Sequence, residues 1–299
     1  MRQSIIVPRL PPGSIPALLL MTASAIAACL ASPAGAATGE EVQARISTDV
    51  ARGRPVIVHV TVALCDNDHQ GIVPVPVSLG NGQDPATNLY WGARYGIGTF
   101  FWHEAGWTRI AVRRPDDPRI LERSVFFRLL PRAGRNVPTY LVADAWDGAQ
   151  MAPAIERFWM FAGGAVEDTV RLLSAGARTV LAAGGASQVI AFVGHNGLMD
   201  APSGPLPVIS GHAGARSGIV LACLSKSYFT DVLHGLGAHP LLLTTGLMAP
   251  EAYTLDAAIR AWVGGGTPAA TRDAAAAAYR RYQGCSVAAA LRLFWSESP

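Results

Sequence analysis

The chain has 299 residues, of which 50% are hydrophobic and 15% are charged, and its formal net charge is +3. This length and composition can supply a substantial core, for either one large domain or two small ones. The small net charge and the absence of a run of Lys and Arg argue against a nucleic-acid partner.

The first 36 residues have the pattern of an export signal. Arginines near the start precede the apolar run Ile15–Ala28, which is too short to span a bilayer comfortably. Ala34-Gly-Ala36 then offers a cleavage site of small residues. Ile26-Ala-Ala-Cys29 equally resembles a lipobox, in which Cys29 would be lipidated, or Cys29 simply lies in the apolar run. We therefore expect a periplasmic or secreted protein, attached to a membrane only through a lipid on Cys29.

Residues 37–54 are expected to form a polar lead-in, and residues 55–299 a single domain. Apolar or β-branched runs predict strands at 55–67, 107–114, 123–130, 137–148, 189–194, 217–227 and 240–247. Helices are predicted at 87–106 (with Asn88 as a cap), 151–174 (interrupted at Gly163-Gly164), 229–236 and 249–265, followed by an Ala-rich helix capped by Thr267-Pro268 and a short last helix.

Strands that alternate with helices predict parallel βαβ units, and therefore an α/β fold with a doubly wound, mostly parallel sheet and helices on both faces. In such sheets the chemistry lies beyond the carboxyl ends of the strands. The predicted ends carry, in chain order, Cys65-Asp66-Asn67-Asp68, then Asp144, His195-Asn196 and Cys223. A cysteine and a histidine on adjacent strand ends would supply what nucleophilic thiol catalysis requires.

The stretches "VIAFVGHNG" (189–197) and "GIVLACLSKS" (218–227) resemble paired segments of the caspase-like cysteine peptidases, which include caspases, metacaspases, separase, gingipains and CHAT domains. In that group one apolar strand ends in His-Gly and a later one ends in Ala-Cys. The resemblance implies a caspase-like fold and amide-bond hydrolysis, with His195 as general base and Cys223 as nucleophile. This chain departs from the pattern because Asn196 stands between His195 and Gly197, so the oxyanion donor would be Asn196 or Gly197.

The same resemblance implies that Asp66 or Asp68, after the first strand, contributes to the pocket for the substrate's P1 side chain, which would favour Arg or Lys there. A metal site in the segment Cys65–His69 is disfavoured, because consecutive residues cannot all face one ion and no second ligand pair has the usual spacing. We expect neither a metal nor a cofactor.

These observations predict an exported cysteine endopeptidase with a Cys223/His195 dyad, acting on a peptide or protein. The alternative is a non-catalytic caspase-like domain that binds a peptide or protein through the same cleft. Rapid alkylation of Cys223 that depends on His195 would favour the enzyme. A disulfide between Cys65 and Cys223 would mask the nucleophile.

Overall fold

The computed structural model describes residues 35–174, 177–201, 206 and 214–297. Residues 1–34 of the predicted export signal (1–36), with Cys29, lie outside these residues, and Gly35–Pro299 form one compact unit. No helix in the described part of the chain is both long and apolar enough to cross a membrane.

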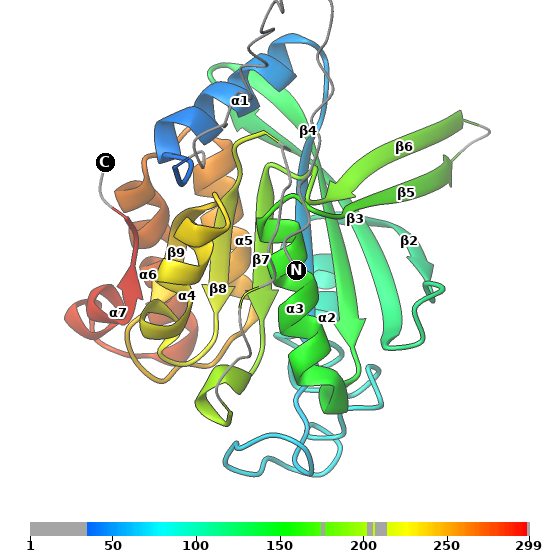
Figure 1. Cartoon of the computed structure of the whole chain (residues 1–299), viewed down its shortest axis with the longest axis vertical. Coiled ribbons are helices and arrows are strands. Elements are labelled where there is room, and N and C mark those ends of the chain that lie inside the picture. The colour runs from blue at the N-terminus through cyan, green and yellow to red at the C-terminus, as the bar shows by residue number, and fades with distance from the viewer. Residues whose placement is uncertain (1–34, 175–176, 202–205, 207–213, 298–299) are drawn as a thin grey trace, which may run out of the picture. The chain divides into compact units, whose positions relative to one another are not determined.

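An eight-stranded sheet with the order β10-β9-β8-β7-β1-β4-β3-β2 forms the centre of this unit (Figure 1). Its strands are β1 (Val56–Ala63), β2 (Thr108–Arg113), β3 (Ile120–Arg132), β4 (Arg135–Trp146), β7 (Val189–Val193), β8 (Ser217–Leu221), β9 (His239–Thr244) and β10 (Phe294–Trp295). The neighbours β9, β8, β7, β1 and β4 run parallel, whereas β2, β3 and β10 join in antiparallel pairs. The expected α/β fold with a mostly parallel sheet is confirmed.

Helices cover both faces of the sheet. They are α1 (Gly39–Ala51), α2 (Ile97–His103), α3 (Met151–Ala162), α4 (Ser225–Gly235), α5 (Ala252–Val263), α6 (Pro268–Gln283) and α7 (Val287–Leu293), with short 3-10 turns at Gly148–Gln150 and Gly197–Met199. Alternate residues of β7 face opposite sides: Val189, Ala191 and Val193 belong to one core, and Ile190 and Phe192 to the other. Burial on both sides accounts for the apolar run of β7 and the near-continuous apolar character of β1.

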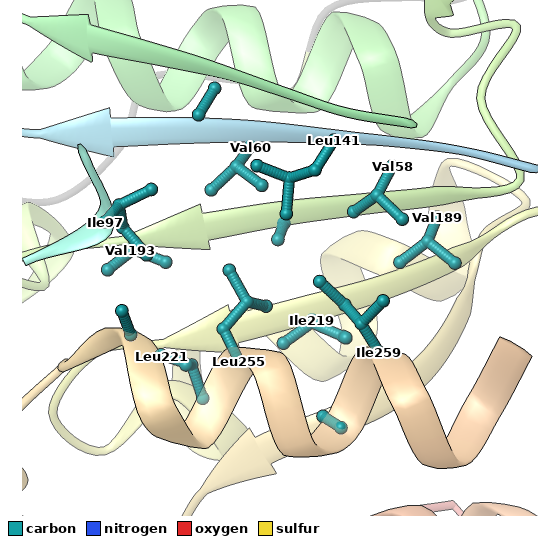
Figure 2. Packing of buried hydrophobic residues seen from close by; sticks show 14 of the residues in the cluster. Val58, Val60, Ile97, Leu141, Val189, Val193, Ile219, Leu221, Leu255 and Ile259 are labelled. Carbon is teal, nitrogen blue, oxygen red and sulfur yellow. The ribbon is translucent and has the colours of Figure 1, made fainter. Parts of the chain in front are cut away.

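One core lies between the sheet and α5. Val58, Val60, Val189, Val193, Ile219 and Leu221 of the sheet meet Leu255 and Ile259 of α5 (Figure 2). Leu255 and Ile259 are fully buried, and each such side chain contributes about 1.5–3 kcal/mol through removal from water. The opposite core contains Phe158 of α3 and Phe229 of α4, packed against Phe192.

Three segments differ from the sequence prediction. The lead-in contains α1, because Thr38 and Glu41 form a reciprocal capping box and Val42 and Ile46 are buried on one helix face. The predicted helix over 87–106 is limited to α2.

The third difference concerns residues 151–174. Helix α3 ends at Ala162, and the chain then forms a separate hairpin of β5 (Glu167–Ser174) and β6 (Ala177–Gly184). Val170 and Leu172 point into a small core beside β1, while Leu173 is 75% exposed. This alternation is that of a strand with one buried face. The Gly163-Gly164 pair ends α3 before β5 begins.

Candidate active site

His195 and Cys223 lie at equivalent positions beyond two neighbouring parallel strands. Val193 of β7 pairs with Leu221 of β8, so each candidate residue follows its strand's last paired residue by two. The backbone N–H of Gly194 donates to Leu221 O over 3.2 Å, and the Asn196 amide Nδ2 donates to Cys223 O over 2.8 Å. These bonds fix the two strand ends to each other.

Gly194 is required for this close arrangement. Its φ is +149°, and an added Cβ would lie 2.7 Å from Ala63 O on β1. Any side chain here would therefore push the end of β7 away from β1 and shift His195, the next residue.

Cys223 lies in a sharp turn between a strand and a helix. Leu224 has a left-handed backbone (φ 53°, ψ 27°), which costs a non-glycine residue about 1–2 kcal/mol, and α4 begins at the following residue, Ser225. The thiol is half-buried, and the Met248 N–H points to Sγ over 3.4 Å. The Met248 carbonyl oxygen lies 3.7 Å from the same sulfur and can accept its S–H.

The imidazole of His195 is held by an acid that the sequence interpretation missed. His195 Nε2 lies 2.7 Å from Asp200 Oδ2, and the same oxygen accepts the Gly71 N–H over 3.0 Å. A carboxylate can only accept, so Nε2 carries the proton and Nδ1 keeps a lone pair able to act as a base. Among the described residues no hydrogen bond joins the ring to Cys223. The only sequence signal for this partner was an acid five residues after the histidine, which is too common to be specific.

The two predicted oxyanion donors are in different situations. The Gly197 N–H donates to His195 O over 3.2 Å and is therefore engaged. The N–H groups of Asn196 and Cys223 have no acceptor within the part of the chain that the structure describes. One free donor thus lies at each of the two strand ends.

Asp66 organises its own loop. Its carboxylate accepts the N–H groups of Asp68 (2.9 Å) and His69 (3.1 Å), the His69 Nδ1 (3.0 Å) and the Gln83 Nε2 (2.8 Å). Burial acts to raise the pKa of Asp66, but these hydrogen bonds outweigh it and the pKa is lowered. Its acceptor positions are filled from within the loop, whereas Asp68 is exposed.

Cys65 is fully buried at the end of β1. The Cys65 N–H donates to Asn88 Oδ1 over 3.1 Å, and Asn88 Nδ2 donates to the Cys65 carbonyl over 2.8 Å. Asn88 therefore holds the end of β1 and does not cap a helix, contrary to the sequence prediction. Burial raises the pKa of the Cys65 thiol to about 11, so it is protonated and unreactive at neutral pH. Cys65, Cys223 and Cys285 are all free thiols in the structure.

A separate charged cluster lies between β1, β3, β4 and β5. His59, Asp144 and Asp168 offer ligand atoms within 4.8 Å of one another, but Arg123 binds both carboxylates, with distances of 2.5–3.1 Å. His59 Nε2 bonds to Asp144, and its Nδ1 accepts the N–H of Gly184. The guanidinium already supplies the positive charge that a metal would bring, so this donor set does not fit a metal ion.

Comparisons with protein-family models, with curated proteins and with solved structures found no match to the chain.

Proposed function

We propose that the protein is an exported cysteine endopeptidase with caspase-like topology, in which Cys223 is the nucleophile and His195 the general base. The observation that carries this proposal is the position of the two side chains at equivalent points beyond β7 and β8, cross-linked by the Asn196–Cys223 hydrogen bond. The order β4-β1-β7-β8-β9 supports the topology, because the histidine follows the third parallel strand along the chain and the cysteine follows the fourth.

In the first half-reaction His195 Nδ1 accepts the proton of the Cys223 thiol, and Sγ attacks the carbonyl carbon of the scissile amide. The carbonyl π electrons move to oxygen, where the free N–H groups of Asn196 and Cys223 are available as donors. Collapse of this intermediate re-forms the C=O bond and breaks the C–N bond. The leaving amine takes its proton from the imidazolium, and a thioester to Cys223 remains.

In the second half-reaction water replaces the amine. His195 Nδ1 removes a proton from water as it attacks the thioester, and the C–S bond breaks to regenerate the thiolate and release a carboxylic acid. Asp200 keeps Nε2 protonated throughout, so that Nδ1 is the nitrogen that exchanges protons.

The test is cleavage of a fluorogenic peptide library by the purified protein, beside Cys223→Ala and Cys65→Ala. We expect turnover by the wild type and by Cys65→Ala, and none by Cys223→Ala. Turnover that survives Cys223→Ala would overturn the proposal. If no peptide is cleaved and a peptidyl electrophile does not label Cys223, the peptidase proposal fails, and binding of uncleaved peptides then tests the alternative of a non-catalytic peptide-binding domain.

A further inference from the structure

The segment that follows β9 is fixed against the candidate nucleophile. Leu224 N–H donates to Gly246 O over 3.0 Å, and two residues later the Met248 N–H reaches Cys223 Sγ. The Ala249 N–H donates to the Tyr279 hydroxyl over 3.2 Å, which fixes the segment to α6 on its other side. The residues just after Met248 therefore have a defined position beside the sulfur.

Glu251 ends this segment and presents a carboxylate without a cationic partner. Its Oε2 accepts the Tyr253 hydroxyl at 2.5 Å and the Gln283 Nε2 at 2.8 Å, which hold the group in place. In the described part of the chain no Lys, Arg or His forms an ion pair with it. Because Glu251 is partly buried, the attraction between its carboxylate and a bound cation would be screened less by water and salt than at an open surface.

The distance to the nucleophile suits a long basic side chain. Three residues of extended chain span about 10 Å, so Glu251 lies within that distance of Met248, which contacts Sγ. An extended Arg or Lys side chain reaches about 6–7 Å beyond its own Cα, given bond lengths of about 1.5 Å. The two lengths are of the same order, so a Glu251 carboxylate that faces Cys223 is within reach of the cationic group of a substrate residue whose carbonyl carbon is attacked.

We propose that Glu251 determines specificity, by binding the cationic side chain of an arginine or lysine on the N-terminal side of the scissile bond. This inference rests on the proposed peptidase function and assigns to Glu251 the role that the sequence suggested for Asp66 or Asp68. Asp66 is already saturated, and Asp68 lies exposed on the loop after β1.

The test uses two peptidyl acyloxymethyl ketones that differ only in arginine against citrulline, its neutral isostere, at the residue next to the ketone. Attack by Sγ on the methylene carbon forms a thioether and expels the carboxylate, and intact mass spectrometry measures the labelling rate of Cys223. We expect the wild type to prefer the arginine probe about 10- to 100-fold, the size of one charge-assisted hydrogen bond. Glu251→Gln should reduce the preference to less than about threefold, while Glu251→Asp and the control Asp68→Asn should largely keep it.

Equal labelling by both probes in the wild type, or a preference lost in Asp68→Asn and kept in Glu251→Gln, overturns the role of Glu251 and leaves the peptidase function intact. If neither probe labels Cys223 saturably, the peptidase function fails and this inference fails with it. Thermal unfolding of each variant checks the fold, and the wild-type comparison of the two probes does not depend on any variant.

Discussion

The buried network around Asp144 offers the sharpest test of what holds the sheet together. Its side chain is 2% exposed and receives two hydrogen bonds from Arg123 and one from His59. Burial alone would raise the pKa of Asp144, but these partners outweigh burial and hold it at about 2. The change Asp144→Asn keeps the size of the side chain and removes its charge, which leaves Arg123 with Asp168 alone.

We expect Asp144→Asn to lower the free energy of unfolding by about 3–5 kcal/mol, because it breaks a buried ion pair and leaves the remaining charge buried. For a domain of this size that loss lowers Tm by about 10 °C. The wild-type stabilisation also depends on pH. The pKa of Asp144 falls from 3.8 to about 2 on folding, so the carboxylate contributes about 2 kcal/mol above pH 4. That contribution is lost as pH falls through 2.

Urea unfolding followed by circular dichroism at pH 7, 5, 3 and 2 measures both effects. We expect the free-energy gap between wild type and Asp144→Asn to be largest at pH 5–7 and to narrow toward pH 2. Asp116→Asn is the matched control, because Asp116 is exposed and has no ion pair among the described residues, and it should change stability by less than about 0.5 kcal/mol. A loss below about 1 kcal/mol at pH 7, or a gap that does not depend on pH, would refute the argument.

Three further predictions concern the candidate site. Asp200→Asn should lower kcat/KM at least about tenfold with little change in Tm, because the amide no longer fixes the His195 tautomer; unchanged kinetics would remove Asp200 from the site. Gly71→Ala should lower kcat/KM in the same direction, because a Cβ there would lie 2.3 Å from Asp200 Oδ1 and displace the carboxylate; wild-type activity would show that the contact is dispensable. Cys65, with its pKa raised by burial to about 11, should resist alkylation at pH 8 in the native protein and react in urea, as peptide mass mapping can show. Labelling of native Cys65 at the rate of Cys223 would contradict its burial.

The sequence predicted the parallel core well because its strands are buried on both faces, and continuous apolar runs such as that of β7 identify such strands directly. The sequence prediction failed for β5, where the only signal for a strand is an alternation of apolar and polar residues over a short segment. Residues 167–174 form a hairpin strand whose Val170 and Leu172 are buried. Val166, Val170 and Leu173 also follow one another at helical spacing, so the sequence alone does not separate the two patterns.

Some residues of the candidate site could be predicted from the sequence and others could not. Parallel strand order places His195 and Cys223 at one edge from sequence alone, since the ends of adjacent parallel strands must meet. Asp200 and Glu251 could not be found in this way, because their positions depend on turn geometry and on contacts with Gly71, Tyr253 and Gln283. The left-handed conformation of Leu224 has no sequence signal either, because glycine is the residue that usually marks it.

The most direct test of the central claim is the rate at which iodoacetamide alkylates Cys223 at pH 7, measured by peptide mass spectrometry in wild type and His195→Ala. Cys285 is the internal reference, because it is also a half-buried free thiol but belongs to the turn between α6 and α7 and not to a strand end. If His195 and Cys223 act together, Cys223 reacts at least about ten times faster than Cys285 in the wild type, and His195→Ala removes that advantage. If both thiols react alike and His195→Ala changes neither rate, the two strand ends do not form a catalytic dyad.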